Sequence, residues 1–247
     1  MERLTGDNCL NHSVMREENI PYPSQRQTGD RIERSSLFSY ACGRCGRCCR
    51  GTLIQTNPYE IAVLAQHLGT STTAIIANYL DGVHLRHQGD GRCIFLSDQG
   101  CEVHSARPFV CRLYPLGHVG TSNGEESFVP IPPQPLTAGS YGESGTVADW
   151  LIQQNIEPMM IECDSYVILF RELFAAFAAH EGDPLGIYDW PEGAATIDMP
   201  ELLDIDAMLM AECPEDIPIT IEGRVARHQE ILRKIFGLDP ENRVLEN

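Results

Sequence analysis

The sequence predicts an α+β protein that is mostly helical, with a small β-hairpin and an irregular cysteine-rich segment. Three observations lead to this fold class. Several segments carry apolar residues at helical spacing behind good N-terminal caps. Two short runs around a Gly-Asp-Gly turn are typical of strands, and seven of the ten cysteines lie between positions 42 and 111.

The helices are expected from their end signals and their apolar stripes. Asn57 is a good N-cap, Pro58 suits the first helical turn, and Gly69 can end the helix. A second short helix is expected over residues 72–80, with Ser71 as its cap. Four further helices are expected over residues 147–155, 159–180, 201–211 and 222–236.

The expected hairpin joins residues 83–88 to residues 92–97 through Gly89-Asp90-Gly91. A second turn, Asp98-Gln99-Gly100, then leads to Cys101. The last cysteine of the group, Cys111, follows a short helical turn that we expect to begin at Ser105.

Charge is distributed unevenly along the chain, whose net charge is −17. Residues 41–120 hold seven Arg and five acidic residues, whereas residues 121–247 hold six basic and 24 acidic residues. Arginine therefore concentrates beside the cysteines. The acidic surface elsewhere disfavours a general nucleic-acid-binding protein, because phosphate binding needs a basic surface.

The sequence also predicts a soluble, cytoplasmic protein with no membrane association. No apolar segment follows a basic start at the N-terminus, so we expect no secretory signal. The apolar stretch of residues 166–179 is interrupted by Arg171 and Glu172, and it is too short to span a bilayer. In a reducing cytoplasm, closely spaced cysteines indicate metal or redox chemistry rather than disulfides.

The spacing Cys-x-x-Cys-x-x-Cys-Cys predicts a metal centre. A gap of two residues lets a turn direct successive sulfur atoms at one centre, and zinc sites and iron–sulfur clusters both use it. Three more cysteines follow within 62 residues of Cys49. The predicted metal ligands are Cys42, Cys45, Cys48, Cys49, Cys93, Cys101 and Cys111.

Two kinds of centre remain open on these residues. Two closed zinc sites need eight ligands, which the seven cysteines and His104 would supply. One 4Fe–4S cluster needs four thiolates, and nearby arginines would help to balance its negative charge. We favour the iron–sulfur cluster, with zinc as the alternative. Neighbouring side chains diverge, so Cys48 and Cys49 are expected to serve two centres, or only one of them to be a ligand, unless an irregular turn brings both to one cluster.

The segment also resembles a known family. The two cysteine blocks, with Cys93-Ile94-Phe95-Leu96 and the surroundings His104-x-x-Arg107-Pro108 and Cys111-Arg112-x-Tyr114-Pro115, resemble the YkgJ-type cysteine-cluster family of zinc- or iron-chelating domains. The resemblance covers roughly residues 40–118. Flagellin lysine N-methylases carry a similar cysteine cluster, so the resemblance implies that iron–sulfur binding is an option.

These observations divide the chain into four expected parts. They are a flexible N-terminal arm (1–38), a cysteine-cluster metal-binding domain (39–120), a Gly/Pro/Ser-rich connection (121–145) and an acidic helical region (146–247). The leading hypothesis is a metal-binding protein with a redox or accessory role. The alternatives are an enzyme that uses the cluster for methyl or sulfur transfer, and a zinc-scaffolded module whose acidic half binds a protein partner. No catalytic residue is predicted.

Overall fold

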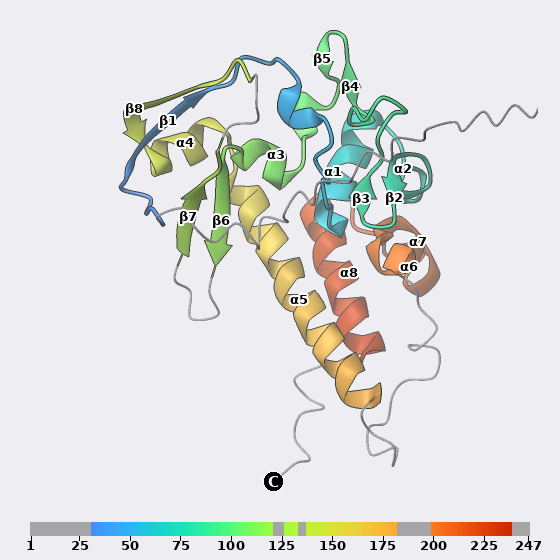
Figure 1. The fold of residues 1–247 in the computed structure, drawn as a ribbon. Helices are drawn as coiled ribbons and strands as arrows, with labels where there is room; N and C mark the ends of the chain where they lie inside the picture. Colours follow the sequence, from blue (N-terminus) through green and yellow to red (C-terminus); the bar gives the residue numbers. More distant parts are fainter. Residues whose placement is uncertain (1–30, 121–125, 133–136, 182–198, 239–247) are drawn as a thin grey trace, which may run out of the picture.

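The computed structural model describes residues 31–120, 126–132, 137–181 and 199–238. Two long helices, α5 (Glu157–Glu181) and α8 (Ile221–Ile235), run side by side, and shorter helices pack against them (Figure 1). The cysteine-bearing segments and the small sheets lie around the upper end of this helix pair (Figure 1). The described residues confirm the α+β class, because helices dominate and the strands form small antiparallel pairs.

The other helices are short. They are α1 (Pro58–Leu68), α2 (Thr72–Tyr79), α3 (Phe109–Leu113), α4 (Val147–Gln153), α6 (Met199–Leu203) and α7 (Ile205–Glu212). Two 3-10 turns, η2 (Arg47–Cys49) and η3 (His104–Ala106), lie in the cysteine-rich segment.

Four two-stranded antiparallel sheets accompany the helices. The pairs are β1 (Leu37–Ala41) with β8 (Ser140–Thr146), β2 (Leu80–Asp81) with β3 (His84–Leu85), β4 (Leu96–Ser97) with β5 (Gly100–Cys101), and β6 (Leu116–Gly120) with β7 (Glu126–Pro130). Strands β7 and β8 thus lie within or extend into residues 121–145, which we expected to form a connection. The boundaries of the four expected parts stay a prediction.

The helix caps follow the sequence signals. The Asn57 side chain accepts a hydrogen bond from the Glu60 amide, and Gly69 ends α1 in the left-handed conformation at φ 64°. Ser71 caps α2 in the same way, through the Ala74 amide. The expected helix over residues 201–211 is instead two helices, because Asp204 turns away from helical geometry and caps α7.

The expected hairpin between residues 83–88 and 92–97 forms only beside its turn. An isolated bridge joins His87 to Cys93, and backbone hydrogen bonds join residues 86 and 88 to residues 94 and 92, whereas β3 pairs with β2 and β4 pairs with β5. Each of these ladders contains two residues per strand, so alternation of side chains gave too short a signal to set the pairing.

The apolar core of the described residues consists of three clusters of buried side chains. One lies between α5, α7 and α8 around Tyr166 and Leu232. A second, around Leu64 and Phe95, packs α1 and α2 beneath Cys93 and Cys101. The third joins β1, β6, β7 and α4 around Phe128 and includes Leu113 of α3.

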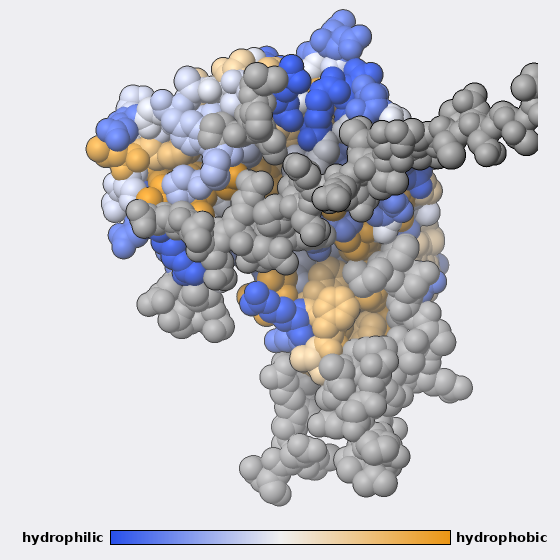
Figure 2. Space-filling view, in the orientation of Figure 1, coloured by the Kyte–Doolittle hydropathy of each residue, from blue (hydrophilic) through white to orange (hydrophobic). Residues whose placement is uncertain are grey.

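The visible surface differs between the two ends of the molecule. Figure 2 shows hydrophilic residues over the β4–β5 hairpin and exposed hydrophobic residues in the region of α5 and α8. On α5, the side chains of Ile161, Ile168 and Phe174 are more than half exposed. None of the helices in the described ranges has the length and apolar character that crossing a membrane requires.

A buried carboxylate, Glu60, joins α1 to the helix that carries Cys111. Its Oε1 accepts a hydrogen bond from the Phe109 amide at 2.7 Å, and its Oε2 accepts one from the Asn57 amide at 2.9 Å. Burial raises the pKa of Glu60 from its ordinary 4.5 to about 7, and these two amides only partly offset that rise. The ionised carboxylate is therefore held in place at an energetic cost.

Replacing Glu60 by Gln tests this arrangement through its pH dependence. The folded state binds the Glu60 proton more tightly than the unfolded state, so stability should fall as pH rises from 4.5 to about 7. We expect this fall to reach up to about 3 kcal/mol in the metal-free wild type and to be absent from Glu60→Gln. Urea denaturation across this range measures both curves, and parallel curves would contradict the assignment.

Candidate metal centre

The loop of residues 42–49 is shaped by two glycines with close neighbours. Gly46 has φ 68° and precedes η2, and a Cβ at this position would lie 3.1 Å from Leu96 Cδ2. A Cβ on Gly43 would lie only 2.5 Å from the carbonyl oxygen of Ala138. The loop is therefore held between the β4 segment on one side and residues 137–139 on the other.

Backbone hydrogen bonds fix this loop to the segment that carries Cys93. The Cys93 amide donates to the Cys49 carbonyl at 2.8 Å, and the Gly51 amide donates to the Gly91 carbonyl at 3.0 Å. The β4–β5 ladder then places Cys101 opposite Leu96. Helix α3 contributes Cys111 from a third direction.

The seven predicted ligands fall into two groups by exposure. The inner cysteines are partly buried, and the outer cysteines are exposed to solvent. The inner group contains Cys48, Cys49, Cys93, Cys101 and Cys111, and the outer group contains Cys42 and Cys45.

The inner cysteines are close enough to affect one another's ionisation. Burial raises the pKa of Cys111, and negative charge on Cys93 and Cys101 raises it further. Burial likewise raises the pKa of Cys93, with a further rise from Cys101. Ionisation of one of these thiols therefore disfavours ionisation of the others, and a bound cation would counteract this effect.

The sequence predicted that the side chains of Cys48 and Cys49 diverge, unless an irregular turn brings them together, and the structure has such a turn. Their sulfur atoms lie 3.9 Å apart because η2 is a tight 3-10 turn. This contact lowers the pKa of Cys48 and raises the pKa of Cys49, whose burial raises it further. The pair can thus carry one negative charge, with one thiol donating to the other sulfur.

The outer cysteines also accept hydrogen bonds from the backbone. Cys45 Sγ lies 3.3 Å from the Ala138 amide and 3.6 Å from the Thr137 hydroxyl. The Ala138 N–H is the first cause of a lowered pKa at Cys45. Cys42 Sγ accepts from the Arg44 amide at 3.4 Å.

Two arginines beside the inner cysteines bind neutral groups. Arg112 donates to the carbonyls of Arg107 at 3.1 Å and Gln154 at 3.2 Å, and also to that of Ser105. Arg107 donates to the Gln154 side chain at 2.5 Å. Within the described ranges, neither guanidinium forms an ion pair with a carboxylate.

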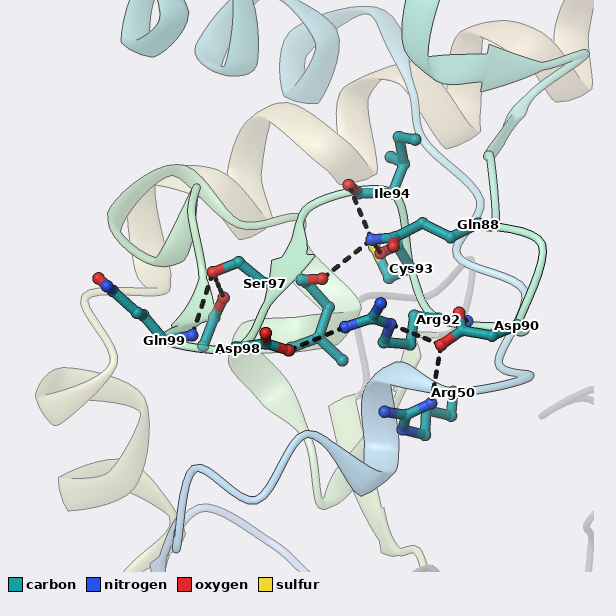
Figure 3. Close-up of polar contacts among 11 residues, drawn as sticks. Arg50, Gln88, Asp90, Arg92, Cys93, Ile94, Ser97, Asp98 and Gln99 are labelled. Carbon is teal, nitrogen blue, oxygen red and sulfur yellow. Dashed lines mark hydrogen bonds and ion pairs between the residues drawn. The ribbon is translucent and has the colours of Figure 1, made fainter.

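Arg50 and Arg92 have carboxylate partners. Asp90 pairs with Arg92 at 2.7 Å and with Arg50 at 3.7 Å, and Arg92 also reaches Asp98 at 3.2 Å (Figure 3). By contrast, burial lowers the pKa of Arg112, and the charge of Arg107 lowers it further. Arg107 and Arg112 therefore form a pair of uncompensated positive charges.

The positive charge of Arg107 acts on the inner cysteines. Burial raises the pKa of Cys101, and the charge of Arg107 opposes this rise. The same guanidinium also helps to lower the pKa of Cys48, after the contact with Cys49. The charge of Arg107 therefore favours the thiolate of Cys48 and partly offsets the effect of burial on Cys101.

The remaining candidates occupy separate places. His104 Nε2 lies 2.6 Å from Arg107 Nη1, so this nitrogen accepts from a guanidinium. Cys163 is buried in the core between the long helices, and Cys213 ends α7. Cys9 lies outside the described residues.

The side chains of the site are of the kind that binds a thiophilic metal. Thiolates are preferred ligands of zinc and of iron–sulfur clusters. In the part of the chain that the structure describes, no three His, Cys, Asp or Glu side chains are grouped closely enough to hold an ion.

Sequence analysis missed several groups that support the cysteines. The N-terminal pattern Asn57-x-x-Glu60 could have indicated a capping box, although not the contact of Glu60 with Phe109. The Ala138 amide that contacts Cys45 left no sequence signal, because any non-proline residue supplies an N–H group.

Comparison with known proteins identifies the cysteine segment. Residues 41–130 match the model of the CxxCxxCC family, described as a putative zinc- or iron-chelating domain. Neither the curated proteins nor the solved structures yielded a match to the chain. This family is the YkgJ-type family that the cysteine pattern resembles, and the match covers all seven predicted metal ligands.

Proposed function

We propose that the domain holds a 4Fe–4S cluster on thiolates drawn from the seven predicted cysteines, and that it serves a redox or accessory role. The observation that carries this proposal is the pair formed by Arg107 and Arg112. Two partly buried guanidiniums without a carboxylate partner in the described residues are costly beside neutral thiols. A polythiolate centre with net negative charge would balance them.

The position of His104 favours iron–sulfur over two zinc sites. Eight donors would be needed to close two tetrahedral zinc sites, and His104 is the eighth that the sequence offers. Its Nε2 faces the Arg107 guanidinium at 2.6 Å, so ligation through that atom would first break this contact. One 4Fe–4S cluster needs only four thiolates, which leaves His104 where it is.

The bound group would supply electron transfer or a Lewis-acidic iron, and the chain's own residues would set its surroundings. Arg107 would stabilise negative charge on the nearby sulfurs, while the Ala138 N–H would donate to Cys45. The exposed outer cysteines lie where a redox partner could approach. Zinc remains the alternative occupant.

Metal content tests the proposal directly. After anaerobic purification we expect about four irons and four acid-labile sulfides per chain, with broad visible absorbance. Stoichiometric zinc without colour would favour the alternative. A colourless protein with neither iron nor zinc would contradict metal binding by this domain. As a paired comparison, Cys111→Ser should reduce metal occupancy at least about tenfold, whereas Cys213→Ser, outside the cysteine pattern, should retain it.

Arg107 should influence the reduction potential of the cluster. Reduction adds negative charge, so loss of a nearby positive charge should lower the potential, by an amount on the order of tens of millivolts in Arg107→Gln. Arg107→Lys keeps the charge and should shift the potential less. Arg227→Gln, on the distant helix α8, is a control for net charge. Equal potentials in wild type and Arg107→Gln, measured by redox titration, would argue against the proposed role of Arg107.

A further inference from the structure

One side-chain amide, that of Gln88, binds three backbone carbonyls of the segment that begins at Cys93. Its Nε2 lies 3.1 Å from the Cys93 oxygen, 3.4 Å from the Ile94 oxygen and 2.9 Å from the Leu96 oxygen (Figure 3). Three acceptors around one atom determine the orientation of the amide, because only its NH₂ group can donate to them.

The segment held by Gln88 connects several parts of the cysteine site. The Cys93 amide donates to the Cys49 carbonyl, which ties this segment to the loop of residues 42–49. Leu96 pairs with Cys101 across the β4–β5 ladder, and its side chain lies against Gly46. A shift of residues 93–96 would therefore move Cys93 and disturb the setting of Cys49 and Cys101.

Little regular structure holds this segment in place. Strands β4 and β5 share two residues each, and the contact of Cys93 with His87 is an isolated bridge beside one hydrogen bond, from the Ile94 amide to the Arg86 carbonyl. The Cys93, Ile94 and Leu96 carbonyls point towards one place, where their partial negative charges repel one another. The Gln88 amide offsets that repulsion with hydrogen bonds to all three oxygens, of which the Cys93 oxygen also accepts from the Leu96 amide at 2.9 Å.

Backbone contacts of Gln88 itself make it a firm anchor. Its amide donates to the Arg92 carbonyl at 2.7 Å, and its carbonyl accepts from the Gly91 amide at 2.9 Å. The turn between them is further closed by Asp90, which pairs with Arg92 and, more weakly, with Arg50 (Figure 3). The side chain thus extends from a turn that is itself attached next to Cys49.

We propose that Gln88 is a positioning residue of the metal centre, which acts by fixing the backbone that presents Cys93 and Cys101. This role rests on the proposed function, because it concerns how well those sulfurs are placed for a metal. Gln88 itself is no ligand, since its NH₂ group faces carbonyl oxygens. It corresponds to the outer-shell groups that orient ligands at other metal sites.

Three variants test the proposal. Gln88→Glu keeps the shape of the side chain but places an acceptor against three acceptors. Gln88→Met keeps the length without either hydrogen-bonding group or charge. Gln99→Glu is the matched control, because it makes the same chemical change in the exposed turn between β4 and β5, where the side chain points away from the segment (Figure 3).

Zinc affinity, measured with Zn²⁺ alone by competition with a chromophoric chelator, is the first measurement. We expect affinities about 10- to 100-fold weaker in Gln88→Glu and Gln88→Met, and unchanged in Gln99→Glu. The visible spectrum of the Co²⁺-loaded variants should also lose intensity from thiolate ligation, which a general loss of stability would not change in the folded fraction. Wild-type affinity and spectrum in both Gln88 variants would overturn the role of Gln88.

Alkylation of the metal-free proteins separates this inference from the proposed function. Iodoacetamide labelling, mapped by mass spectrometry, should modify Cys93 several-fold faster in Gln88→Met than in wild type, while buried Cys163 reports any global unfolding. Failure of wild type to bind any metal would refute the proposed function. Equal Cys93 labelling in Gln88→Met and wild type would refute the anchoring of this segment, whatever the wild type binds.

Discussion

The cysteine site depends on the attachment of the loop of residues 42–49 to the segment that follows Gly91. Neither piece has enough regular structure to hold its own shape, so each is shaped by the other. The Cys93–Cys49 hydrogen bond and the packing of Gly46 against Leu96 provide this attachment. The helical cores beneath fix where the two pieces meet, and α3 then adds Cys111 from the side.

Local signals were sufficient to predict much of the fold from sequence. The caps at Asn57 and Ser71 act on their own helices, and both helices were found where expected. The hairpin around Asp90 was predicted too long, because the residues further from the turn pair with β2 and β5 instead. The candidate ligands could be read from spacing, whereas Gln88 could not, since nothing in a lone glutamine indicates three carbonyl partners.

Charge gives the site its chemical character. The chain is strongly acidic, yet Arg107 and Arg112 bind neutral groups next to five partly buried cysteines. Burial raises the pKa values of Cys93 and Cys111 and so favours their neutral thiols. A bound metal would favour the thiolates, and its binding would release their protons. The same arginines would then lose most of their electrostatic cost. The folding of this segment and its metal binding should therefore be coupled.

The central claim is that cysteine sulfur atoms ligate the metal that this domain carries. X-ray absorption at the edge of whichever metal accompanies the protein after anaerobic purification tests it most directly. The account predicts a first coordination shell made of sulfur and, for the iron–sulfur form, a second shell of iron. A first shell dominated by oxygen and nitrogen would contradict it, because the metal would then be bound by groups other than these cysteines.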